Sequence, residues 1–270
     1  MTGLTTIRQR LRQRLDALLC RYVIDLTCFE SLGENCEFGF LLRSHAFASG
    51  GFFRWAFTPL HSLIHILEKD FEGVYALEQL RPRFGAMVED TRYDILFHSQ
   101  LKSQQQPDGS WCFTASAEEQ QAIYANEKAK VDYLVAKFRR RLVEERLILV
   151  LKAFAPPPPE QLRALQAVLR PVLRRRGSCL LVVTPAQPGQ RPGGVRWCGA
   201  HLLQGTVAFM APGESADALD YVNWNRLIMK AYWMAFSPGR YLFTRLTVAV
   251  LSRCGFSSFH GWWDQPRSCS

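Results

Sequence analysis

A strand–helix–strand pattern between residues 147 and 184 constrains the fold of this chain most. Residues 147–153 (LILVLKA) and 179–184 (CLLVVT) are short, continuous apolar runs, which are typical of strands buried on both faces. Between them, residues 160–176 repeat leucine at helical spacing, and Gly177 ends the helix. Such a unit forms a right-handed crossover between parallel strands. We therefore predict an α/β fold: a three-layer, Rossmann-like mixed sheet that contains a parallel βαβ unit.

Around this unit the chain divides into three predicted segments. Residues 1–28 combine a basic amphipathic helix, over residues 5–22, with a lead-in strand. Residues 29–236 form the α/β domain, and residues 237–270 form a basic, aromatic C-terminal extension. A content of 48% apolar and 21% charged residues excludes the disordered, collagen-like and coiled-coil classes.

The formal net charge of +9 is concentrated at the two ends of the chain. Residues 1–22 carry five Arg against one Asp, and residues 237–270 carry four Arg against one Asp. A basic surplus favours an anionic partner, such as a phosphate, an acidic glycan or a membrane surface. The helix over residues 5–22 has two interpretations: a peripheral anchor on anionic lipid, or a helix packed on the domain with a solvated basic face. We expect no nucleic-acid partner, because the basic runs lack a recognition motif.

Location and cofactors are predicted from the motifs that the sequence lacks. The apolar stretch at residues 246–252 falls far short of the roughly 20 residues that span a membrane, and charges interrupt the apolar patch near the N-terminus. We therefore expect a cytoplasmic protein, with peripheral contact to the inner membrane through residues 5–22 as one option. The eight cysteines form no Cys-x-x-Cys pair, and His61 and His65 have no evident partner ligand, so we expect free thiols, no metal and no cofactor.

Cys36 is the sharpest candidate for chemistry. It follows an apolar stretch and a glycine turn, Ser31-Leu32-Gly33-Glu34-Asn35, and precedes a predicted helix over residues 36–43. A strand–turn–helix exposes a side chain at a sheet edge, and a helix N-terminus favours the thiolate form of cysteine. Glu34 and Glu37 flank the thiol, and a carboxylate close to it would raise its pKa. A purely structural cysteine at the turn is the competing interpretation.

His98 is the most plausible general base. It ends an apolar strand, the second arm of a hairpin predicted over residues 85–99, where a side chain emerges from the sheet. A cysteine followed downstream by a histidine is the order in many thiol enzymes. The alternative is a structural histidine at a strand end. Asp108, Asn126 and Asp132 follow His98 without a context that would select one of them as a third catalytic residue.

The segment SLGENCEFG at residues 31–39 resembles the hallmark SLGxNCExG of a bacterial protein family labelled papain-like cysteine peptidases, a domain of unknown function. The resemblance extends over roughly residues 29–236 and includes the helix with Leu41-Leu42-Arg43, the aromatic segment Phe53-Arg54-Trp55-Ala56, the strand ending at His98 and the βαβ unit.

The resemblance implies that Cys36 is a nucleophile and His98 its base, in a peptidase or another thiol-dependent hydrolase or acyl transferase. A papain-type enzyme has an oxyanion-hole glutamine shortly before its cysteine, whereas residue 30 is Glu, so Asn35 is our candidate for that role. Members of the family that this segment resembles look similar to proteins found beside glycan-building enzymes. The alternative prediction is therefore a non-peptidase enzyme or accessory protein of surface polysaccharide biosynthesis, which binds a sugar phosphate or nucleotide sugar. Arg43, Arg54 and Trp55 would then bind the substrate.

Overall fold

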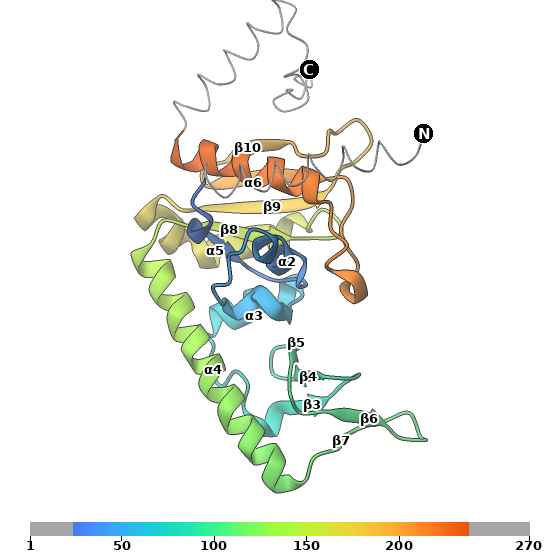
Figure 1. Cartoon of the computed structure of the whole chain (residues 1–270). Helices are drawn as coiled ribbons and strands as arrows, with labels where there is room; N and C mark the ends of the chain where they lie inside the picture. The colour runs from blue at the N-terminus through green and yellow to red at the C-terminus, as the bar shows by residue number, and fades with distance from the viewer. Residues whose placement is uncertain (1–23, 238–270) are drawn as a thin grey trace, which may run out of the picture.

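The computed structural model describes residues 24–237, so the predicted helix over residues 5–22 and residues 238–270 of the C-terminal extension lie outside the described residues. The chain has a mixed α/β fold built on a five-stranded sheet (Figure 1). Its strands, in spatial order, are β1 (Phe29–Ser31), β8 (Ile148–Lys152), β9 (Cys179–Pro185), β11 (Leu202–Val207) and β10 (Val195–Gly199). The first four run parallel, and β10 pairs antiparallel with β11.

The βαβ unit is confirmed. Strands β8 and β9 pair in parallel, with Ile148 opposite Cys179, and α5 (Pro159–Arg176) connects them. This helix ends at Gly177, whose φ of 66° lies in the left-handed region that favours glycine. The lead-in strand predicted before residue 29 is wrong in its extent. Residues Leu26–Cys28 form a 3-10 helix that is capped by the Asp25 side chain, and β1 begins only at Phe29.

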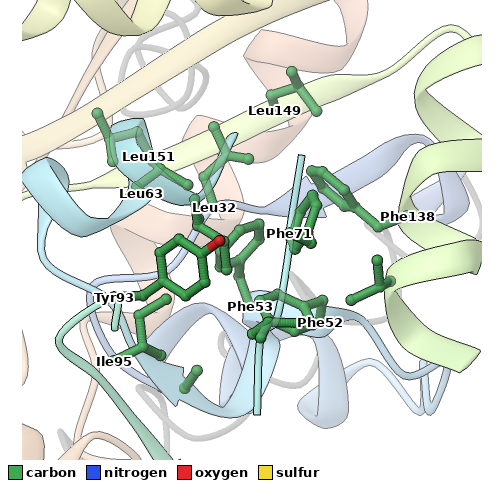
Figure 2. Packing of buried hydrophobic residues seen from close by; sticks show 14 of the residues in the cluster. Leu32, Phe52, Phe53, Leu63, Phe71, Tyr93, Ile95, Phe138, Leu149 and Leu151 are labelled. Atoms are coloured by element: carbon green, nitrogen blue, oxygen red, sulfur yellow. The ribbon is translucent and has the colours of Figure 1, made fainter. Parts of the chain in front are cut away.

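Alternate side chains of the central strands enter two separate hydrophobic clusters, one on each face of the sheet. Ile148 and Val150 pack with residues of α2 (Glu37–Ser44) and α6 (Tyr221–Phe236), of which Trp224 is fully buried. Leu149 and Leu151 pack on the opposite face with residues of α3 (Leu60–Glu68), α4 (Ala117–Glu144) and α5. Figure 2 shows the aromatic rings that join this second cluster, contributed by Phe52, Phe53, Phe71, Tyr93 and Phe138.

A smaller antiparallel sheet places His98. Its strands, in order, are β2 (Ala56–Phe57), β5 (Ile95–His98), β4 (Met87–Asp90) and β3 (Leu80–Pro82). The predicted hairpin over residues 85–99 is confirmed, with Met87 paired to His98 at its open end. On its other side β5 pairs with β2, which follows directly on the 3-10 helix Phe52–Trp55. This 3-10 helix contacts both β1 and α2, so the end of β5 is held close to the beginning of α2.

Two further strands, β6 (Ser103–Gln105) and β7 (Trp111–Phe113), form a separate hairpin. The long helix α4 begins with a capping box between Ser116 and Glu119. Within residues 24–237, no helix is both long enough and apolar enough to cross a bilayer.

Candidate active site

The turn that carries Cys36 follows the carboxyl end of β1. Gly33 and Glu34 both have positive φ, 97° and 77°, so the chain reverses sharply between the strand and α2. A side chain at position 33 would place its Cβ 2.8 Å from the Cβ of Thr58, which makes glycine the residue that fits. Cys36 is the N-cap of α2 and is half-buried. The predicted strand–turn–helix placement of this thiol is confirmed.

The structure brings Cys36 and His98 together. The Cys36 Sγ lies 3.7 Å from the His98 Nε2, although the two residues are 62 positions apart in the sequence. His98 is exposed at the end of β5, so the pair sits where solvent or a ligand can reach it. A sulfur–nitrogen separation of this size permits a proton to pass between the two groups after a small adjustment.

None of the three predicted candidates for a third catalytic residue is bonded to His98. Asp108 accepts hydrogen bonds from the backbone and the hydroxyl of Ser110, and Asp132 pairs with Lys128 on the surface of α4. Asn126 lies on α4 without a recorded bond to the imidazole. Across residues 24–237, Cys36 is the one protein group hydrogen-bonded to the His98 ring, so the pair is a dyad in the described structure.

Glu37 does not face the thiol as the sequence suggested. Its side chain is fully buried and accepts three hydrogen bonds from separate parts of the chain. The donors are the Lys152 Nζ at 3.0 Å, the Trp224 Nε1 at 2.8 Å and the backbone N–H of Ala211 at 3.2 Å. No motif in the sequence predicted this buried group. The available signal was Lys152 itself, a charged residue at the end of an otherwise apolar strand, where an unpaired cation would be costly to bury.

Opposing effects act on the acidity of Cys36. Burial is the largest effect and raises the pKa of its thiol, while the positive charges of Lys152 and Arg43 lower it. The predicted repulsion from Glu34 and Glu37 is not among the causes of this shift. The pKa of the Glu34 carboxyl is itself raised by burial, and its Oε2 is buried without a hydrogen-bond partner among the described residues.

Asn35, the candidate oxyanion donor, is buried and engaged with the backbone. Its Nδ2 donates to the carbonyl of Ala211 at 3.1 Å, and its Oδ1 accepts the backbone N–H of Glu37 at 2.9 Å. The side chain therefore fixes the turn and the first residue of α2. By contrast, no hydrogen bond within the described residues occupies the backbone N–H of Cys36. This N–H belongs to the free donors expected at a helix N-terminus.

The three predicted substrate-binding residues separate into two kinds. Arg54 is buried, and its guanidinium donates to the carbonyls of Gly39, Phe47 and Ser49. This position is structural, and we correct the expectation that Arg54 meets a substrate. Arg43 is exposed and lies over the half-buried ring of Trp55, with 4.4 Å between its Cζ and the ring centroid. Arg43 and Trp55 thus remain available near the Cys36 turn.

The other cysteines provide a comparison for Cys36. The five within residues 24–237 are all free, and Cys28 and Cys179 are buried in the core. Cys112 is half-buried, and Cys198 is exposed on β10. In the same range, no group of three or more His, Cys, Asp or Glu side chains could hold a metal ion.

Comparison with known proteins gives no relative. No protein-family model matches the chain, and no curated protein and no solved structure matches it. The functional argument therefore depends on the residues of the site.

Proposed function

We propose that this protein is a thiol-dependent enzyme in which Cys36 and His98 perform hydrolysis or acyl transfer. The observation that carries the proposal is the 3.7 Å separation between the Cys36 Sγ and the His98 Nε2, at the N-terminus of a helix and open to solvent. A purely structural role for Cys36 and His98 does not explain this arrangement, because a partly exposed thiol beside an exposed imidazole contributes little to the stability of a fold.

The proposed chemistry follows from the positions of these groups. His98 takes the thiol proton at Nε2 as the sulfur attacks the carbonyl carbon of an ester, thioester or amide. The C=O π bond opens, and the oxygen that becomes negative accepts the free N–H of Cys36. The imidazolium returns the proton to the leaving group as the C–O, C–S or C–N bond breaks. Water or a second nucleophile then releases the acyl group from the sulfur, with His98 again as base.

Two finer predictions belong to the same proposal. We keep the resemblance to the papain-like cysteine peptidase family, because its hallmark segment coincides with the Cys36 turn and includes Gly33, whose conformation requires glycine. We also keep the Rossmann-like three-layer arrangement. It is supported by the separate clusters on the two faces of the sheet, with α2 and α6 on one side and α3, α4 and α5 on the other.

A role in polysaccharide assembly is a second proposal, now with a narrower basis. Arg54 no longer supports it, because it is buried and its Nη1 and Nη2 donate to backbone carbonyls. The exposed Arg43 on the Trp55 ring is the feature that favours it, since an arginine on an aromatic platform suits an anionic sugar. The test is a thermal-shift titration with nucleotide sugars. A saturable rise in melting temperature that disappears in Arg43→Ala would favour this second proposal.

The test of the thiol enzyme is the site-resolved rate of alkylation by iodoacetamide, read by mass spectrometry. Cys36 should react faster than the exposed Cys198 at pH 7, and His98→Ala should slow Cys36 at least about tenfold without slowing Cys198. With p-nitrophenyl acetate, wild type should release a burst of nitrophenol that Cys36→Ala abolishes and Cys198→Ala retains. Equal alkylation rates at both cysteines, unchanged in His98→Ala, would refute the dyad.

A further inference from the structure

Lys152 is a buried cation next to the proposed nucleophile, and it needs a physical explanation. It is the last residue of β8, the strand that pairs in parallel with β1, and Ser31 of β1 pairs with Val150. The carboxyl ends of the two strands therefore meet at one edge of the sheet, where the Cys36 turn begins. The Lys152 side chain is 1% exposed, and an ammonium at such depth is stable only with charged and polar partners.

The partner of Lys152 is attached to the nucleophile. Glu37, the first residue of α2, directly follows Cys36 and is 0% exposed. Its carboxylate binds Lys152 of β8, Trp224 of α6 and the Ala211 N–H that follows β11. Three separate elements thus fix the first turn of α2, and with it the position of Cys36. A lysine placed only to balance Glu37 would have no need to act on the thiol.

The same geometry brings the ammonium to the Cys36 turn, because its Nζ is 3.0 Å from the carboxylate of Glu37, the residue that follows Cys36. Charged groups around Cys36 are Lys152 from β8, Arg43 from α2 and the carboxylates of Glu34 and Glu37, while His98 approaches from β5. Burial raises the pKa of the Cys36 thiol, and Lys152 is the first of the two cations that lower it. In turn, burial lowers the pKa of Lys152, and Glu37, Glu34 and Cys36 raise it. Arg43 is exposed and screened by solvent, so Lys152 is the cation with the larger influence.

We propose that Lys152 is a positioning residue of the Cys36 site, which stabilises the thiolate electrostatically while its ion pair with Glu37 fixes the nucleophile. The inference rests on the proposed function. In the step concerned, the S–H bond of Cys36 breaks and an N–H bond forms at His98 Nε2. The sulfur becomes negative, the imidazole becomes positive, and Lys152 keeps its three protons throughout. The fixed ammonium lowers the free energy of the charged pair without moving a proton itself.

The experiment measures the pH midpoint of iodoacetamide alkylation at Cys36 in a His98→Ala background, where the thiol titrates without its base. Adding Lys152→Met should raise that midpoint by about one pH unit, because a nearby positive charge is lost. Adding Lys152→Arg should restore most of the original midpoint. Lys128→Met is the matched control, since it removes a lysine from a carboxylate pair on the surface of α4 and should leave the midpoint unchanged.

If Lys152→Met does not fold, the double variant Glu37→Gln/Lys152→Met is measured in its place, because it removes both buried charges together. Its midpoint should also rise. An unchanged midpoint in a folded Lys152→Met or double variant, or an equal rise in Lys128→Met, would overturn the inference. Failure of the proposed function is a separate result. In that case the single variant His98→Ala would be alkylated at Cys36 as fast as the wild type, independently of the results for the Lys152 variants.

Discussion

Replacing Lys152 by methionine leaves a carboxylate without its countercharge in the protein interior. Glu37 and Lys152 are 0% and 1% exposed, and their Oε2 and Nζ atoms are 3.0 Å apart. After the substitution, the Glu37 carboxylate keeps two neutral donors, the Trp224 Nε1–H and the Ala211 N–H. Removing one member of such a buried pair costs about 3–5 kcal/mol, a large fraction of the ~5–15 kcal/mol that stabilises a typical protein.

The reverse substitution has a comparable effect for a different reason. Glu37→Gln leaves the buried Lys152 ammonium without its countercharge. The new amide NH₂ group also faces either the Trp224 or the Ala211 N–H, so one hydrogen bond becomes a contact between two donors. The double variant removes both charges and the penalty of leaving one unpaired. Its loss of stability should therefore be smaller than the sum of the two single losses, with a coupling free energy of about 2 kcal/mol or more.

Urea unfolding followed by circular dichroism measures this cycle, with the four proteins compared at equal m value. The matched cycle uses Lys128 and Asp132, an i,i+4 pair on α4 whose side chains are 29% and 57% exposed. This surface pair should couple by only about 0.3–0.5 kcal/mol. If the Lys152–Glu37 coupling is no larger than that of the surface pair, the argument from buried charge is refuted.

Other substitutions test the remaining parts of the site. Arg54→Met should lower the free energy of unfolding, measured by urea titration, by about 2–4 kcal/mol, because three carbonyls lose a charged donor. A loss below about 0.5 kcal/mol would contradict the structural role of Arg54. Gly33→Ala should lower the free energy of unfolding by more than about 1 kcal/mol and slow alkylation of Cys36, since φ at this position is 97° and the new Cβ meets Thr58. Unchanged stability and an unchanged alkylation rate would show that the turn tolerates a side chain. Burial raises the pKa of Glu30 to about 7 from its usual 4.5, although the Arg141 guanidinium that donates to its Oε2 lowers it, so between these values the folded chain holds a proton that the unfolded chain has released. Stability should then fall by up to about 3 kcal/mol as the pH rises through that window, and Glu30→Gln should remove the fall in urea midpoints measured from pH 5 to pH 8. Equal pH profiles for both proteins would argue against a protonated Glu30.

Local patterns in the sequence predicted the parts of the fold that local physics decides. The apolar runs that became β8 and β9 can be placed because a strand buried on both faces needs an unbroken series of apolar side chains. The Cys36 turn and the hairpin ending at His98 were also local predictions, based on a glycine turn and on an apolar strand. That the two meet follows from the pairing of β5 with β2, which the sequence does not state.

What the sequence could not predict depends on contacts between distant residues. Lys152 and Glu37 are 115 positions apart, and only the parallel register of β1 and β8 brings them to the same edge of the sheet. The structural role of Arg54 was equally unpredictable, because an arginine near an aromatic residue is as typical of a binding site as of a structural position. Its burial depends on the loop that brings the Phe47 and Ser49 carbonyls to the guanidinium. Composition and spacing contain neither relationship.

The two sides of the Cys36 site perform different tasks in this scheme. On the open side, His98 and Arg43 are exposed, so a ligand can reach both side chains and solvent screens the charge of Arg43. On the closed side, Lys152 and Glu37 are buried, so salt screens their ion pair much less. Because burial raises the pKa of the Cys36 thiol, the proposed mechanism needs His98 to take the proton as attack begins. The buried ammonium then contributes most at the moment when negative charge develops on the sulfur, which is where preorganised electrostatics contributes to rate.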